Sequence, residues 1–92
     1  MSETMRSSAG LDDRRKKLLF RAWHRGMREM DFMLGTFANH AIADLNDEEL
    51  AEFEMLMQAP DPDMYKWLSG VDEIPKIWDS PIVHRIRHFH LG

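Results

Sequence analysis

The sequence predicts an all-α protein, a compact single-domain bundle of about five helices. Apolar residues recur three and four positions apart, which is the spacing of one buried helix face. No segment shows the two-residue alternation that is typical of a β-strand. A chain of 92 residues and 10.9 kDa has room for one modest hydrophobic core.

The first two predicted helices are separated by a glycine. Asp12 or Asp13 can cap the first helix, which runs to about Arg25 and bears a basic side. The second helix, about residues 27–44, contains Gly35, whose cost of about 1 kcal/mol relative to Ala indicates a close helix crossing or a slight bend. Its apolar face consists of Met30, Leu34, Phe37, Ala38, Ala41, Ile42 and Leu45.

The third predicted helix has the clearest beginning. Asn46 is a good N-cap, and Glu49 stands three residues later, which predicts a capping box. Pro60 ends this helix. Its buried stripe comprises Leu50, Phe53, Leu56 and Met57.

Prolines mark the beginnings of the last two predicted helices. Asp61 as N-cap and Pro62 as first residue begin the fourth helix, which Gly70 ends. Residues 71–79 form a loop. Ser80 and Pro81 then begin the fifth helix, whose inner face carries Ile82, Ile86 and Phe89.

The composition of the chain indicates its domain division and its location in the cell. Residues 1–11 lack periodicity and are predicted to be a flexible N-terminal tail before a helical domain at 12–92. No apolar run approaches 18 residues and residues 1–11 hold no apolar stretch, so we expect neither membrane insertion nor a signal peptide. The absence of cysteine suits a reducing compartment. A cytoplasmic location is therefore the simplest interpretation. We also expect a bacterial protein and a monomer, neither of which follows from composition.

Charge is unevenly distributed along the chain. Residues 1–30 hold eight Lys or Arg and four Asp or Glu, a net charge of +4. Residues 31–80 hold two Lys or Arg and twelve Asp or Glu, a net charge of −10. Residues 81–92 carry a net charge of +2. The basic first helix could suggest nucleic-acid binding, but the pI of about 5.7 and the missing sequence motifs argue against it. Docking to an acidic protein surface, or simple solvation, explains the basic side better.

The junction between the first two helices concentrates polar residues. Gly26 can take the positive φ that ends the first helix, or it can cap the second helix with Glu29 in the capping-box position. Charged residues near a helix start are usually solvated capping groups, but this junction holds more of them than one cap needs. The candidate partner-binding residues are therefore Arg25, Gly26, Met27, Arg28, Glu29 and Asp31.

The run from Arg25 to Glu29, followed by Asp31, resembles the RGxxE signature of the small bacterial and mitochondrial flavinylation factors of succinate dehydrogenase. Further features fit the same family: Trp23 before the motif, Leu45-Asn46-Asp47-Glu48-Glu49, and Asp61-Pro62-Asp63-Met64-Tyr65-Lys66-Trp67-Leu68. The resemblance covers about residues 14–69.

This resemblance implies a non-enzymatic assembly factor that promotes covalent attachment of FAD to the flavoprotein subunit of succinate dehydrogenase, with fumarate reductase as a further candidate client. It implies that the client holds the FAD, so no cofactor is bound tightly by this chain. The helper would hold a client conformation in which the bond to the flavin forms autocatalytically.

Two alternatives remain open at this point. A small regulatory interaction module, antitoxin-like or cytoskeleton-binding, would use the same junction on another target. A metalloprotein would use His84 and His88, four residues apart, with His90 nearby. No cysteine or acidic ligand stands at a matching spacing, and no phosphate loop or Ser-His-Asp set is recognisable, so neither a metal site nor a catalytic residue is predicted.

Overall fold

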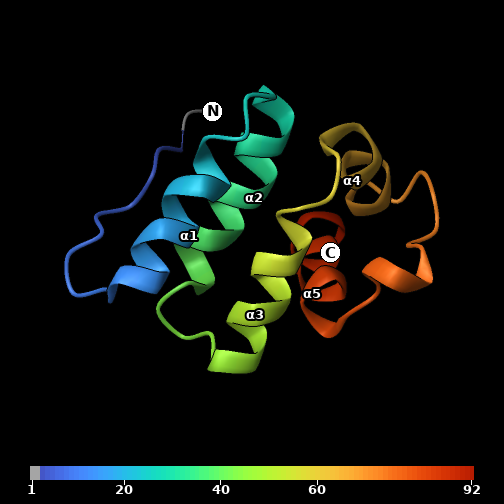
Figure 1. Cartoon of the computed structure of the whole chain (residues 1–92). Helices are drawn as coiled ribbons and strands as arrows, with labels where there is room; N and C mark the ends of the chain where they lie inside the picture. Colours follow the sequence, from blue (N-terminus) through green and yellow to red (C-terminus); the bar gives the residue numbers. More distant parts are fainter. Residues whose placement is uncertain (1–2) are drawn as a thin grey trace. The chain divides into compact units, whose positions relative to one another are not determined.

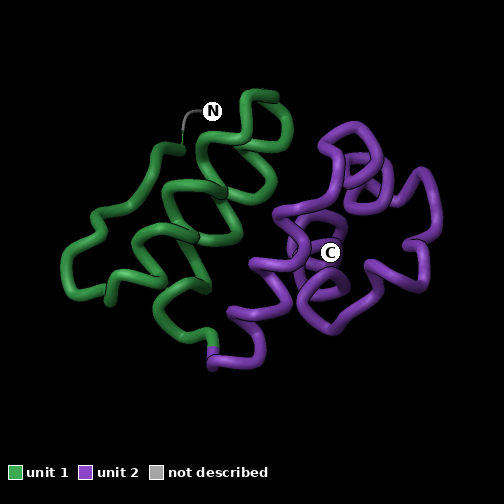
Figure 2. The backbone as a smooth tube through the Cα atoms, viewed as in Figure 1, with its two compact units in different colours: residues 1–45 green, residues 46–92 purple. Residues whose placement is uncertain are grey.

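The protein is all-α, as predicted. The computed structural model describes residues 3–92, and within them five α-helices and one 3-10 helix are joined by turns without any strand (Figure 1). The helices are α1 (Asp13–Trp23), α2 (Arg28–Ala41), α3 (Asp47–Leu56), α4 (Asp61–Leu68) and α5 (Pro81–Leu91), and the 3-10 helix is η1 (Lys76–Trp78). They form two compact units, residues 1–45 and 46–92 (Figure 2). No helix in the described part of the chain is both long and apolar enough to cross a membrane.

Unit 1 consists of α1 and α2, which lie side by side (Figure 1). Leu18, Leu19 and Ala22 are the buried residues of α1. The predicted apolar face of α2 is buried in the same unit and includes Met30, Leu34, Phe37 and Ala38. The face prediction is thus confirmed, although α2 ends at Ala41 and residues 42–44 form a turn.

Arg15 connects the beginning of α1 to the chain that follows α2. Its Nε donates a 3.0 Å hydrogen bond to the carbonyl of Ile42, and Nη2 donates to the carbonyl of Leu45. Nη1 also contacts the Asp12 carboxylate at 2.8 Å. Asp12 caps α1, and the hydrogen bond from the Arg15 backbone N–H lowers the pKa of its carboxyl below the usual value. Arg15 therefore satisfies the carbonyl of Ile42, which is the C-cap of α2, and the carbonyl of Leu45 in the segment that follows.

Gly35 marks a close helix contact, as predicted. A Cβ built at Gly35 would lie 2.7 Å from Cε3 of Trp23 and closer still to Cδ2 and Cε2. The indole of Trp23 thus rests directly on the backbone of α2. The Trp23 Nε1–H donates a 3.1 Å hydrogen bond to Oδ1 of Asn39, one turn further along α2.

Asn39 also binds the segment before α1. Its Oδ1 accepts a 2.9 Å hydrogen bond from the backbone N–H of Arg6. Its Nδ2 donates to Glu3 Oε2 and to the carbonyl of Thr4, each at 2.7 Å. Residues 3–11 contain no helix, and Leu11 is buried. The division into a flexible tail at 1–11 and a domain at 12–92 stays a prediction, and residues 1 and 2 lie outside the described part.

Unit 2 consists of α3, α4, η1 and α5, with α5 packed against both α3 and α4. The predicted capping box is confirmed: Asn46 Oδ1 accepts from the Glu49 N–H at 2.8 Å, and Glu49 Oε1 accepts from the Asn46 N–H at 2.9 Å. The carboxylate of Glu52 accepts a 3.0 Å hydrogen bond from the backbone N–H of Ile82 in the first turn of α5.

Two details of unit 2 were predicted wrongly. The N-cap of α4 is Pro60, so Asp61 and Pro62 are its first two residues. Phe89 is 41% exposed, because Ile82, Val83 and Ile86 form the buried face of α5 instead. The loop at 71–79 contains η1, whose Trp78 stacks on the buried Trp67 with ring centroids 6.0 Å apart.

The contact between Trp23 and Gly35 leads to a stability prediction. Gly35→Ala should lower the free energy of unfolding by about 1–3 kcal/mol, because the new methyl group overlaps the rigid indole. The gain of about 1 kcal/mol in helix propensity is not enough to offset this overlap. Denaturant unfolding measures the difference.

A double-mutant cycle with Trp23→Leu tests the physical cause. Gly35→Ala should cost much less in the Trp23→Leu background, where the flat ring is gone. An equal cost in both backgrounds would contradict the proposed overlap.

Candidate functional site

The predicted junction is the short turn that joins α1 to α2. Helix α1 ends at Trp23 with His24 as C-cap, and α2 begins at Arg28 with Met27 as N-cap. Of the two roles that the sequence left open for Gly26, the structure does not show the N-cap role or the capping box that would go with it. Glu29 is the second residue of α2, one position too early for such a box, and no side chain caps this helix.

Gly26 reverses the chain within this turn. Its φ is +94°, which confirms the predicted positive φ and which side chains rarely adopt. A Cβ added to Gly26 would meet no atom within 4 Å. Glycine is therefore required here by backbone conformation, whereas the space around it is open to a partner.

Asp31 holds the turn in place. Its Oδ1 accepts a 2.5 Å hydrogen bond from the backbone N–H of Arg25, and its own N–H donates to the carbonyl of Met27 at 2.9 Å. The carboxylate thus ties the first residue after His24 to the first turn of α2. Asp31 is half-buried, which shields this bond from part of the solvent. Within the candidate site, Asp31 organises the backbone.

The structure brings all six predicted site residues together in one turn and the beginning of one helix. Gly26, Arg28 and Glu29 are exposed, while Arg25 and Met27 are half-buried. The turn therefore presents a guanidinium, a carboxylate and an open stretch of backbone side by side. Such groups bind carbonyls, carboxylates and backbone amides of another protein.

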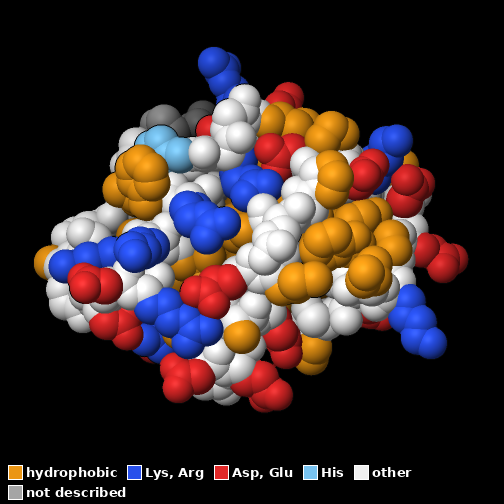
Figure 3. Space-filling model, in the orientation of Figure 1, with side chains coloured by type: hydrophobic (Ala, Val, Ile, Leu, Met, Phe, Trp, Pro, Cys, Tyr) orange, Lys and Arg blue, Asp and Glu red, His pale blue; other side chains and the backbone are white. Residues whose placement is uncertain are grey.

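An aromatic pair beside the turn was missed by the sequence analysis. Phe20 is 55% exposed, and its ring stacks on that of His24 with centroids 3.9 Å apart and planes 17° apart. The sequence already contained a signal for this pair, because Phe20 and His24 stand four residues apart and are not among the buried residues of α1. Figure 3 shows Lys and Arg side chains gathered over the region of α1, with exposed hydrophobic side chains beside them.

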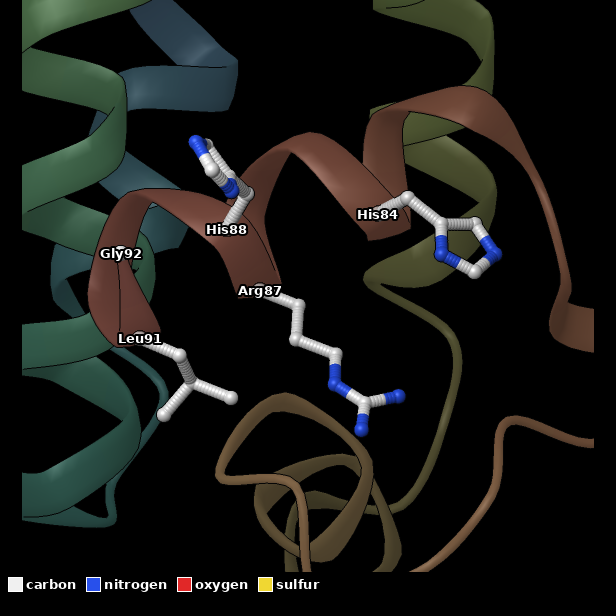
Figure 4. A pocket seen from close by; sticks show the side chains of 5 residues that line it. All are labelled: His84, Arg87, His88, Leu91 and Gly92. Atoms are coloured by element: carbon white, nitrogen blue, oxygen red, sulfur yellow. The ribbon is translucent and has the colours of Figure 1, made fainter.

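Two of the three histidines of α5 border a shallow hollow (Figure 4). It is lined by His84, Arg87, His88, Leu91 and Gly92. Arg87 and Leu91 point toward α4, whereas His88 points to the other side of α5. His84 Nε2 lies 2.6 Å from Asp79 Oδ1, an acidic partner that the sequence analysis did not find. The two imidazoles therefore do not converge on one point, and no group of three potential metal ligands occurs in residues 3–92.

The fold and the turn define a class: small helical proteins that display a charged, glycine-containing turn between two packed helices. The family model described as "Flavinator of succinate dehydrogenase" matches residues 16–90. The chain belongs to this family, which confirms the resemblance. The match also includes α5, beyond the part that the sequence motifs covered.

Similar proteins come from mitochondria and from bacteria. "Succinate dehydrogenase assembly factor 2, mitochondrial" of Dictyostelium discoideum is 36% identical over 74 residues, which are 80% of this chain and 52% of that protein. "FAD assembly factor SdhE" of Acetobacter pasteurianus is 36% identical over 73 residues, 79% of this chain and 67% of that protein. The chain thus spans about half the length of the mitochondrial relative.

The bond between Asp31 and the turn leads to a second prediction. Asp31→Ala should speed hydrogen exchange at the Arg25 amide and lower the free energy of unfolding by about 1 kcal/mol, because the amide loses its acceptor. Asp31→Asn keeps an acceptor oxygen and should retain most of the protection. NMR-detected exchange measures both variants, and unchanged exchange in Asp31→Ala would contradict the assigned role.

Proposed function

We propose that this protein is an assembly factor that binds the flavoprotein subunit of succinate dehydrogenase and promotes covalent attachment of its FAD. The observation that supports this proposal most is the family match over residues 16–90, which includes the exposed turn. The Dictyostelium relative is named as a succinate dehydrogenase assembly factor and the Acetobacter relative as an FAD assembly factor, and both names support this proposal. They do not favour the alternative of a regulatory module with another client.

In this proposal the turn is the surface that contacts the client. Gly26 has no side chain and open space around it, so a client backbone can approach closely. Arg25 and Arg28 donate hydrogen bonds to client carbonyl or carboxylate groups. Glu29 extends from the first turn of α2 toward the flavin site, or orders a client loop. Asp31 keeps these groups in position through its bond to the Arg25 amide.

The chain acts without forming a bond to the flavin itself. The client holds the FAD, and the helper raises the population of the client conformation in which the flavin and its protein nucleophile are close together. The chain needs no catalytic residue or cofactor of its own for this role. We extend the proposal to fumarate reductase as a second client, to a monomeric helper, and to the bacterial cytoplasm as its location.

Covalent flavin on the client tests the proposal. In a bacterial host that lacks its own assembly factor, wild-type protein should restore in-gel flavin fluorescence of the denatured flavoprotein subunit. Gly26→Arg should reduce this signal at least tenfold, because the new side chain occupies the space that the client needs. Glu29→Ala should also reduce it.

Gly10 provides a matched control for backbone strain. Its φ is +83° and a Cβ there would also meet no atom within 4 Å. Gly10→Arg should therefore suffer a similar cost of about 1–2 kcal/mol in stability while it still restores fluorescence. The proposal fails if deletion of the factor leaves the fluorescence unchanged. If Gly26→Arg and Gly10→Arg reduce the fluorescence equally, the effect of Gly26→Arg is due to lost stability and not to lost client binding.

A further inference from the structure

We infer that the exposed side of α1 extends the client-binding surface, and that it binds an apolar pocket with an acidic rim on the flavoprotein subunit. This surface, the α1 face, consists of Lys17, Phe20, Arg21 and His24. The inference rests on the proposed function, since it concerns the same client. It adds a second contact area to the turn at residues 25–31.

The four residues share one side of the helix. They stand at positions i, i+3, i+4 and i+7, which a helix places in one stripe. All four are exposed, and Phe20 keeps 55% of its surface accessible. Because His24 directly precedes Arg25, the α1 face continues into the turn without a gap.

The aromatic pair is held in a fixed arrangement before any partner binds. His24 Nδ1 lies 2.7 Å from the carbonyl oxygen of Phe20. A carbonyl can only accept, so Nδ1 carries the proton and donates. This bond and the 3.9 Å ring stack restrict both side chains. Little conformational entropy remains to be lost on binding, which favours Phe20 as an anchor residue.

The charges around Phe20 indicate the chemistry of the partner. Lys17 and Arg21 are exposed on the same side of α1 as Phe20. Residues 1–30 carry a net charge of +4, while residues 31–80 carry −10. An exposed aromatic residue between two cations complements an apolar pocket with carboxylates at its rim. Burial of the ring provides affinity, and the cations provide orientation and speed of association.

Binding of the purified, FAD-loaded flavoprotein subunit tests the inference by calorimetry. Phe20→Ala should raise the Kd at least tenfold, as expected for an anchor residue. Lys17→Glu/Arg21→Glu should also raise the Kd and make it less dependent on salt. Circular dichroism should show unchanged helix content for both variants, because the substituted side chains are exposed.

Phe89→Ala is the matched control. Phe89 is 41% exposed on α5, and its ring contacts that of His90 with centroids 5.0 Å apart. Its removal should change the Kd by less than about twofold, within the usual range of surface substitutions. The control for the charge reversal Lys17→Glu/Arg21→Glu is Lys66→Glu/Lys76→Glu, which reverses two charges in unit 2.

The outcomes separate the inference from the proposed function. If wild-type protein binds and Gly26→Arg does not, while Phe20→Ala and the α1 charge reversal bind like wild type, the α1 face is overturned and the proposed function stands. If wild-type protein does not bind the subunit, both are overturned. If Phe89→Ala weakens binding as much as Phe20→Ala, the effect is not specific to α1 and the inference fails.

Discussion

The packing of the Trp23 indole on the backbone of Gly35 is the contact on which unit 1 depends. Trp23 is the last residue of α1, so this contact fixes the end of α1 against the middle of α2. The chain then has only residues 24–27 in which to reverse direction. That short distance explains the φ of +94° at Gly26. The turn is therefore a consequence of how closely the two helices approach.

Asn39 extends this arrangement to the chain that precedes α1. It stands one helical turn after Gly35, where its Oδ1 receives the indole N–H and the amide of Arg6. The hydrogen bond between Trp23 and Asn39 is partly buried, where an unpaired polar group would be costly. No buried side-chain N or O in the described residues lacks a partner. The same side chain thus satisfies Trp23 and holds the segment at residues 3–6 against α2.

The elements that were predictable from the sequence are those defined by local patterns. The apolar face of α2 follows from periodicity, and the Asn46 capping box follows from two residues three apart. The ends of α1 and α4 were not predictable to the residue, because tertiary contacts and competing caps decide them. Arg15 belongs to the basic side that the sequence predicts for the first helix, yet its guanidinium reaches the carbonyls of Ile42 and Leu45. Long side chains can reach groups that no local spacing encodes.

In the candidate site, too, one part was predictable from the sequence and another part was not. The six residues at 25–31 could be found because they adjoin each other in sequence, but the role of Asp31 required coordinates. Trp23 holds the turn from α1 and Asp31 holds it from α2. In the proposed function, a turn that is fixed at both ends would not need to become ordered on binding, so its binding energy would remain available to hold the client. That property suits a helper whose proposed task is to stabilise one conformation of another protein.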